Sequence, residues 1–284
     1  MSDDSAHRLR AALGGASLEP PVTGLTFVAP EALAPGLEAK VGPARALADS
    51  AASAAVDFAF VPSWEEWAAD ALRELVLAGV AALWVVQGAL WPALRIVGVA
   101  EGLQATVVQP EGLVPMLNAA LTGALAGVQA GLALGASGIV VAEDLAGAGG
   151  PLIAPDFATD EVFTRLRVLA QAATRRGVPT ILHTDGDARA FFRPALRAGF
   201  VALHGDFGGE GNLERALRAA RPLGLTLAGG LATAALTDAA RATLLGTSVS
   251  VEAAAGRLMI ADDGGIETPQ QGAALLEALA AARR

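Results

Sequence analysis

The chain has 284 residues, of which 53% are hydrophobic and 17% are charged, and its net charge at neutral pH is −9. This length suits one α/β barrel or two ordinary domains, and the negative charge argues against binding to nucleic acid or to an anionic membrane. The absence of cysteine excludes disulfides, iron–sulfur clusters and thiolate zinc sites. Together with an acidic, polar N-terminus unlike a signal peptide, it predicts a cytoplasmic protein.

Apolar runs that end in polar or turn residues alternate with helical patterns along the chain. A helical pattern covers residues 5–18, and strand-like runs begin near residues 22, 56, 81, 138, 179, 200, 225 and 257. Helices are predicted between these runs, and a last helix extends from Pro269 to the C-terminus. Eight strands that alternate with helices are typical of a (β/α)₈ barrel, so we predict a TIM barrel that forms a single domain over residues 1–284. A doubly wound open sheet is the alternative, but no early glycine-rich dinucleotide-binding motif supports it.

Some segments need individual interpretation. A helix at residues 64–78 is predicted to begin at the N-cap Ser63, with Glu66 completing a capping box. Residues 89–112 show little periodicity and receive no assignment. Residues 114–141 are apolar but rich in glycine and alanine and interrupted by polar residues, so we interpret them as a buried helix plus a strand, not as a membrane span. The four tryptophans are expected in the core and in loops, because no basic residues alternate with them.

The densest group of polar residues follows two consecutive predicted strands. One strand ends in His183 and Asp185, and the next ends in His204 and Asp206. In a barrel of βα units these strand ends form the rim at which chemistry occurs. Alternate residues of an extended strand point to the same side, so His183 and Asp185 can converge as ligands of a divalent metal or as an oriented acid–base pair. For His204, a structural histidine with satisfied hydrogen bonds is an equal alternative.

Further carboxylates follow neighbouring predicted strands. Glu143 and Asp144 are adjacent and therefore point to opposite sides of a strand. We favour Asp144 as the residue that faces the rim, because it is nearer to the following loop of small residues, which is a suitable place for ligand contacts. Asp187 is interpreted first as the N-cap of the next helix. Asp262 and Asp263 either face the same rim or lie in a solvated loop.

Slightly more than half of the chain, residues 138–284, resembles the uroporphyrinogen decarboxylase-like barrels, a superfamily that includes corrinoid-linked methyltransferases. The resemblance rests on EDLAGAGGPLIAP at 143–155, ILHTDGD at 181–187, LTLAGGLATAAL at 225–236 and DDGGIETPQQGAALLEAL at 262–279. It implies a (β/α)₈ barrel that works as a lyase of the decarboxylase type or as a methyltransferase. The resemblance also implies a divalent metal as cofactor and a corrinoid protein as partner in the methyltransferase case.

Several residues that the decarboxylases and the methyltransferases of this superfamily use are replaced in this chain. The decarboxylases have an arginine-rich segment that neutralises the carboxylates of their substrate, and residues 22–61 contain no such segment. The tyrosine of the decarboxylases is absent, and their C-terminal Gly-His-Gly corresponds to Asp263-Gly264-Gly265. The zinc methyltransferases use a His-x-Cys pair and a distant cysteine. In this chain the pair corresponds to His183 and Asp185, so aspartate replaces the first cysteine, and the distant cysteine falls near Gly264.

Two classes of function follow from these residues. In the first, the protein is an enzyme whose barrel mouth holds His183, Asp185, Asp144 and His204, with the first two as ligands of a divalent metal. Its substrate would be a small molecule or a methyl group carried by a corrinoid protein. In the second, the chain is a catalytically degraded barrel that binds a ligand or partner without turnover, which the missing cysteines, tyrosine and histidine favour. The partners to test are a small-molecule substrate, a corrinoid protein and a second copy of the chain in a homodimer, whereas neither nucleic acid nor membrane is expected.

Overall fold

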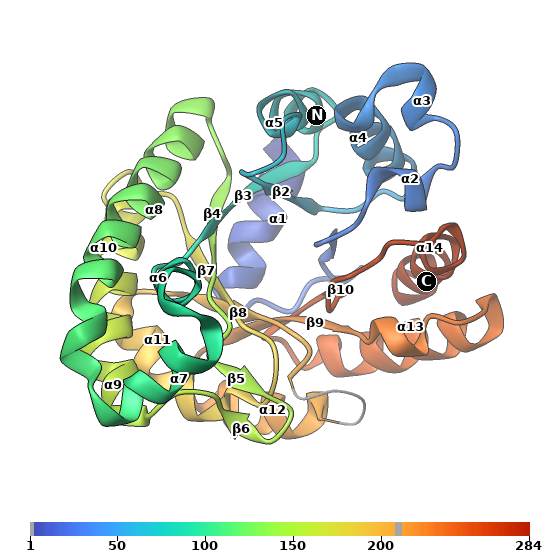
Figure 1. Cartoon of the computed structure of the whole chain (residues 1–284). Helices are drawn as coiled ribbons and strands as arrows, with labels where there is room; N and C mark the ends of the chain where they lie inside the picture. Colours follow the sequence, from blue (N-terminus) through green and yellow to red (C-terminus); the bar gives the residue numbers. More distant parts are fainter. Residues whose placement is uncertain (1–2, 208–211) are drawn as a thin grey trace.

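The computed structural model describes residues 3–207 and 212–284. Within these residues, eight parallel strands close into a barrel in the order β1-β10-β9-β8-β7-β4-β3-β2 (Figure 1). The strands are β1 Thr23–Leu25, β2 Phe58–Pro62, β3 Ala81–Gln87, β4 Gly138–Ala142, β7 Thr180–His183, β8 Ala202–His204, β9 Thr226–Leu231 and β10 Leu258–Asp262. The pairing of β1 with β10 closes the sheet. The predicted (β/α)₈ barrel is therefore confirmed, and the open sheet is excluded.

Helices surround the barrel and connect successive strands (Figure 1). In the first half they are α2 Pro30–Leu33, α3 Glu38–Val41, α4 Pro43–Ser53, α5 Ala68–Leu77, α6 Leu90–Val97, α7 Val99–Val108 and α8 Val114–Leu134. In the second half they are α9 Pro155–Phe157, α10 Phe163–Thr174, α11 Phe192–Ala198, α12 Leu213–Ala220, α13 Ala239–Ala254 and α14 Pro269–Ala282. The loop after β4 also contains a small hairpin, β5 Ala146–Gly147 and β6 Gly150–Pro151.

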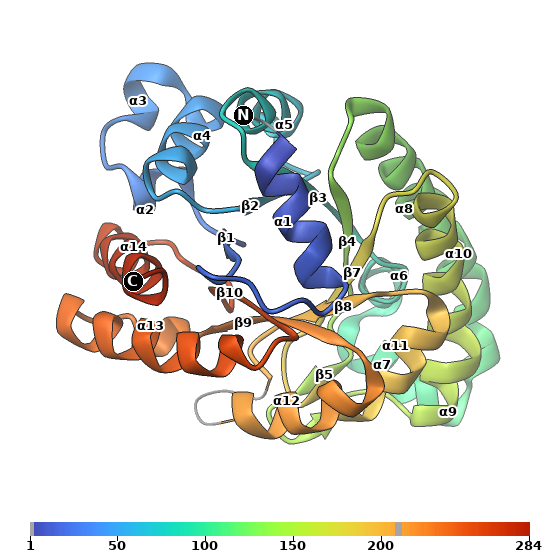
Figure 2. The ribbon, with the colours of Figure 1, turned by 180° about the vertical axis from the view of Figure 1, so that it is seen from behind.

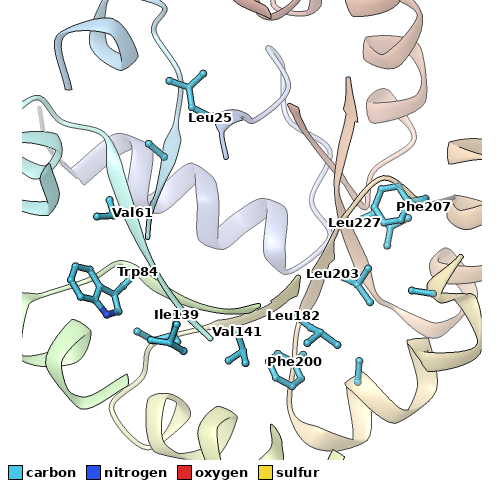
Figure 3. Close-up of a cluster of buried hydrophobic side chains, with 14 of the residues drawn as sticks. Leu25, Val61, Trp84, Ile139, Val141, Leu182, Phe200, Leu203, Phe207 and Leu227 are labelled. Atoms are coloured by element: carbon cyan, nitrogen blue, oxygen red, sulfur yellow. The ribbon is translucent and has the colours of Figure 1, made fainter. Parts of the chain in front are cut away.

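The strands separate two apolar layers, because successive residues of a strand point to opposite sides of the sheet. In β4, Ile139 and Val141 pack outward against the helices, whereas Val140 points into the barrel. Figure 3 shows the outer layer, in which Leu182 of β7 and Leu203 of β8 belong to the same cluster. The residues beside them therefore point inward, and that direction includes the histidines at the ends of β7 and β8.

The N-terminal end of the barrel is closed by α1, Asp3–Leu13 (Figure 2). Leu9 and Leu13 of this helix are buried and belong to the apolar cluster inside the barrel. The hydroxyl of Thr226, at the start of β9, donates to the carbonyls of Ala12 and Leu13 at 3.2 Å each. With this end filled, the C-terminal end of the barrel is the one left for a site.

Two local predictions need correction, and one segment that had no assignment has a definite structure. The helix α5 begins at Ala68, so Ser63 and Glu66 form no capping box. Residues 89–112, which the sequence left unassigned, form α6, α7 and a 3₁₀ turn at Pro110–Leu113. The apolar helix α8 is an outer helix with one buried face, and it packs on β3 and α10. By length and composition alone, one helical stretch in the described chain, Pro110–Leu134, could cross a membrane.

Candidate metal centre and active site

A cavity of about 620 Å³ opens at the C-terminal end of the barrel. Its lining combines carboxylates, aromatic rings and an imidazole: Phe27, Trp64, Gln87, Trp91, Arg95, Ala142, Asp144, His183, Asp185, Asp206, Asp263, Gly264 and Gly265. These residues come from β1, β2, β3, β4, β7, β8 and β10 or from the segments that follow them. TIM-barrel enzymes place their active sites at this end of the barrel, so the cavity is the candidate site.

His183, Asp144 and Asp185 meet at one side of the cavity. One potential ligand atom from each lies within 4.8 Å of the other two, and His183 Nε2 is 3.7 Å from Asp144 Oδ1. The three residues come together because β4 and β7 are neighbours in the barrel, with Ala142 and His183 in register. The backbone N–H of Asp185 donates to Asp144 Oδ1 at 3.3 Å, which holds the two loops against each other.

The carboxylate of Asp185 has an unsatisfied oxygen. Its Oδ1 is buried and has no hydrogen-bond partner among the residues that the structure describes. Burial, followed by the negative charges of nearby carboxylates such as Asp144 and Asp206, raises the pKa of Asp185 to about 7. A buried polar atom without a partner costs free energy. A cation or a hydrogen-bond donor on a bound molecule would remove this cost.

His183 and His204 are adjacent on β7 and β8, where they are register partners. Their Nδ1 atoms are 2.8 Å apart, and the Nε2 atom of His204 lies 3.0 Å from the backbone carbonyl of Asp262. Burial lowers the pKa of His183 to about 4 and the pKa of His204 well below its ordinary value. Both rings are therefore neutral at pH 7. The structure places His204 beside His183 but completely buried and outside the cavity lining, whereas the sequence treated both as residues of the barrel mouth.

Aromatic rings cover both imidazoles. The Phe27 ring centroid is 4.7 Å from that of His183, and the Phe60 ring centroid is 5.0 Å from that of His204. Phe60 and His204 are almost completely buried. The apolar rings keep water away from the Nδ1–Nδ1 contact. The other nitrogen of His183, Nε2, lies on the side of Asp144.

Glu143 and Asp144 have separate roles, because the side chains of adjacent residues point to opposite sides. The Glu143 carboxylate is completely buried and accepts the backbone N–H groups of Leu90 at 2.9 Å and Trp91 at 3.2 Å. Glu143 therefore caps the start of α6, and burial raises its pKa to about 7. Asp144 lines the cavity, and its carbonyl accepts the indole N–H of Trp91 at 2.8 Å.

Asp187 has a structural role. Its side chain accepts the backbone N–H of Arg189 and so caps the 3₁₀ turn at Ala188–Phe191. The Arg189 guanidinium forms an ion pair with the Asp187 carboxylate at 2.5 Å. The N-cap interpretation of Asp187 thus matches the structure, and Arg189 does not line the cavity.

The two carboxylates after β10 differ in position. Asp262 is completely buried and accepts the N–H and the hydroxyl of Thr26, while burial raises its pKa to about 6. Asp263 lines the cavity and accepts the backbone N–H of Thr233 at 2.8 Å. Of the two positions that the sequence left open, the cavity therefore belongs to Asp263.

Several lining residues were not singled out by the sequence. Phe27 and Gln87 line the cavity, as do Trp64 and Trp91, two of the tryptophans that were expected to serve core and loop packing. All four follow β1, β2 or β3, or end β3. The rule that strand ends gather at one rim applies equally to the first half of the chain, and with it these residues could have been found.

No protein-family model and no curated protein matches the chain. Among solved structures, 54 chains match. A methyltransferase from Methanosarcina mazei is 18% identical with a TM-score of 0.69, and the match covers 98% of each chain. An archaeal fructose-1,6-bisphosphate aldolase is 12% identical with a TM-score of 0.50, covering 98% of this chain and 96% of its own. A chitinase from Chromobacterium violaceum is 13% identical with a TM-score of 0.50, covering 91% of this chain and 99% of its own. At these identities the likeness shows the barrel fold alone.

Proposed function

We propose that this chain is a divergent uroporphyrinogen decarboxylase-like barrel that binds a divalent metal ion through His183, Asp144 and Asp185. We further propose that it acts there on a small molecule or on a methyl group carried by a corrinoid protein. The observation that supports this best is the buried Oδ1 of Asp185, which has no partner in the described chain and belongs to a group of three potential ligands.

The donor set fits a divalent ion. One imidazole nitrogen and two carboxylate oxygens are ligands that Zn²⁺ accepts, and oxygen donors also suit Mn²⁺. Three protein ligands are typical of catalytic zinc sites, which keep a further position for substrate or water. When bound, such an ion supplies Lewis-acid chemistry that stabilises negative charge on a substrate atom.

The residues around the three ligands would orient them and control protons. Trp91 holds the backbone of Asp144, and the Phe27 ring lies against His183. Because the pKa of Asp185 is raised to about 7 in the metal-free site, this carboxyl exchanges a proton near neutral pH. Asp185 can therefore serve as a ligand or, in a metal-free reaction, as a general acid or base.

A methyl-group substrate is the option that the comparisons favour. The Methanosarcina mazei methyltransferase matches along almost the whole of both chains, and the segments at 143–155 and 181–187 resemble the superfamily that includes corrinoid-linked methyltransferases. In such a reaction the cobalt–carbon bond of a methylcorrinoid breaks, the methyl group bonds to a thiolate sulfur, and the cobalt retains the electron pair. A soluble model of this reaction uses methylcobalamin and a small thiol.

A catalytically degraded barrel is the second candidate. Asp185 stands at the position of the zinc-binding cysteine of the resembling methyltransferases, and Asp263-Gly264-Gly265 lacks the histidine of the decarboxylases. The cavity is lined by Asp144, Asp185, Asp206 and Asp263. These carboxylates suit a cationic or neutral ligand that is bound without turnover.

Metal binding is tested with the purified protein. We expect Zn²⁺ or Mn²⁺ to raise the Tm of the wild type, because a ligand that binds only the folded state stabilises it. The variants Asp185→Asn and His183→Gln should show a much smaller increase. Asp187→Asn is the matched control, because Asp187 lies in the same loop but pairs with Arg189, and it should retain the increase. No change in Tm with Zn²⁺, Mn²⁺, Mg²⁺ or Ca²⁺ would contradict the metal site.

Turnover is tested separately. Protein loaded with the stabilising metal is mixed with methylcobalamin and a thiol, and the absorbance of cob(I)alamin is followed under anaerobic conditions. We expect cob(I)alamin to form with the wild type and with Asp187→Asn but not with Asp185→Asn. A protein that binds the metal but produces no cob(I)alamin with any thiol would favour the degraded barrel.

A further inference from the structure

A chain of hydrogen bonds links the interior of the barrel to the cavity. It begins at the carbonyl of Asp262, passes through Nε2 and Nδ1 of His204 and reaches Nδ1 of His183. We propose that His204 is a positioning residue that fixes the tautomer of His183, so that Nε2 of His183 offers a lone pair to the cavity. This inference deepens the proposed function and rests on it, because a lone pair of His183 Nε2 that faces the cavity has a role only if a cation binds there.

The direction of the chain is set by the carbonyl of Asp262. A carbonyl oxygen has no proton and can only accept a hydrogen bond. At 3.0 Å, the distance from this oxygen to His204 Nε2 is that of an N–H···O hydrogen bond. His204 must therefore carry its proton on Nε2.

The second step concerns the other nitrogen of His204. This ring is completely buried and lies against the apolar Phe60 ring, so water cannot solvate a charged form and an imidazolium is strongly disfavoured. In a neutral imidazole one nitrogen is a donor and the other is an acceptor. Because Nε2 is the donor, Nδ1 is the acceptor, and the proton in the 2.8 Å contact must belong to Nδ1 of His183.

The third step gives the state of His183. With its proton on Nδ1, neutral His183 has an unprotonated Nε2, which lies 3.7 Å from Asp144 Oδ1. That distance is too long for a hydrogen bond, which agrees with two acceptors facing each other. The buried Oδ1 of Asp185 adds another lone-pair atom without a donor nearby in the described chain. A cation is the species that satisfies all three residues together.

The barrel geometry makes this relay possible. His183 and His204 are register partners, so their inward side chains lie next to each other. Ala228 of β9 is the register partner of His204 on the other side and points into the barrel with a single methyl group. Metal-binding histidines usually donate their second N–H to a carboxylate, a carbonyl or water. Here a second histidine takes that place and is itself oriented by a carbonyl.

The test is direct observation of the tautomers by ¹⁵N NMR of histidine-labelled, metal-free protein at pH 7.5. The chain contains three histidines, so assignment by single substitutions is practical. We expect His183 to show a protonated Nδ1 and an unprotonated Nε2, and His204 to show a protonated Nε2. A protonated Nε2 on His183 would overturn the inference.

Two variants separate positioning from packing. His204→Phe retains a ring of similar size but removes the acceptor, and we expect the Nε2-protonated tautomer of His183 to become populated. His204→Gln provides an amide oxygen for His183 and an amide N–H for Asp262, and it should restore the wild-type tautomer. A folded His204→Phe protein in which His183 keeps its Nδ1 proton would also overturn the inference. If His204→Phe does not fold, the wild-type and His204→Gln spectra decide the question.

Zinc binding provides the functional readout. By calorimetry we expect His204→Phe to bind Zn²⁺ about 10- to 100-fold more weakly than the wild type, as is usual when a partner of a metal-binding histidine is lost. His204→Gln should bind nearly as tightly as the wild type. If the wild type itself does not bind Zn²⁺, the proposed function is contradicted, and the NMR tautomers still decide the inference about His204.

Discussion

Among single residues, Asp185 determines how metal binding depends on pH. Its pKa is raised to about 7 in the metal-free protein, whereas burial lowers the pKa of His183 to about 4. A metal ion binds the carboxylate form, so below pH 7 it must displace the proton of Asp185. We expect the apparent Kd for Mn²⁺, measured by calorimetry, to fall about tenfold per pH unit between pH 5 and pH 7 and to level off above pH 7.

The control for this pH dependence is Asp185→Asn. An amide does not titrate, so this variant should bind Mn²⁺ more weakly and without the slope between pH 5 and pH 7. An unchanged slope in Asp185→Asn would assign the displaced proton to another group and contradict the role given to Asp185.

The same carboxyl affects the stability of the metal-free protein. The pKa of Asp185 rises from its ordinary value of 3.8 to about 7 on folding, so between these values the folded state holds a proton that the unfolded state has lost. The free energy of unfolding therefore falls as pH rises through this window. In urea titrations with chelator, Asp185→Asn should be more stable than the wild type at pH 8 by on the order of 1–3 kcal/mol. Below pH 4 the difference should vanish, and a less stable variant at pH 8 would contradict the argument.

The candidate site could be predicted from the sequence in part. His183, Asp185 and Asp144 were found because they follow strands, and strand ends meet at one rim in any barrel of βα units. The hydrogen bond between His183 and His204 could not be found, because it depends on the register of β7 with β8. One strand carries no information about the register of its neighbour, and a shift by one residue would turn the side chain to the other face.

At the scale of elements, Glu143 connects the end of β4 to the start of α6. Its carboxylate accepts the N–H groups of Leu90 and Trp91, which have no intrahelical acceptor at the start of a helix. In Glu143→Ala both N–H groups lose their partner, and leaving a buried donor unsatisfied costs about 1–3 kcal/mol. We expect a loss of about 2–4 kcal/mol in the free energy of unfolding, measured by urea titration.

A substitution at Gly88 tests the same connection from the other side. A Cβ atom at Gly88 would lie 2.1 Å from Glu143 Oε2, so Gly88→Ala must displace the carboxylate. Gly88→Ala should lower the free energy of unfolding, as Glu143→Ala does. The double variant should lose less free energy of unfolding than the sum of the two single losses, because both substitutions remove the same interaction. Full additivity would show that Gly88 and Glu143 act independently.

Elements were predictable where the pattern of apolar residues matched their burial. The eight strand-like runs stood out because the strands are buried on both faces, against the helices and inside the barrel. The segment containing α6 and α7 did not stand out, because large apolar side chains such as Ile96, Val107 and Val108 are exposed there. Exposed apolar residues blur the amphipathic periodicity from which a surface helix is recognised.

For the whole molecule, Asp57 links both ends of the chain at the closed end of the barrel. Its buried carboxylate forms ion pairs with Arg8 of α1 at 2.6 Å and with Arg283 near the C-terminus at 2.9 Å. It also accepts the backbone N–H of Thr23 at 2.9 Å. In Asp57→Ala these donors lose their partner at a site that is largely shielded from solvent.

We expect Asp57→Ala to lower the free energy of unfolding by about 3–5 kcal/mol, because removal of one partner leaves buried charge uncompensated. The matched control is Asp70→Ala, which removes the exposed ion pair between Asp70 and Arg73 and should change stability by less than about 1 kcal/mol. Equal effects of the two substitutions in urea titrations would show that Asp57 does not hold the barrel end together.

The charges of the cavity predict that the chain is not an authentic uroporphyrinogen decarboxylase. A substrate with many carboxylates must be met by fixed cations, because burying unpaired carboxylates is prohibitive. Among the described residues that line the cavity, Arg95 is the one cation, and it donates to Gln87 at 3.3 Å. The lining instead presents several carboxylates, and the net charge of the whole chain is −9. Both would repel such a substrate.

We therefore expect negligible decarboxylation of uroporphyrinogen by the purified protein, with and without added Zn²⁺ or Mn²⁺. The products are separated by chromatography and detected by porphyrin fluorescence after oxidation, and an authentic decarboxylase in the same buffer serves as the positive control. Coproporphyrinogen formed above the level of a protein-free sample would show that the acidic cavity does accept a polycarboxylate. A chain with Asp206→Asn and Asp263→Asn should still be inactive, because removing negative charges does not supply the cations that this substrate requires.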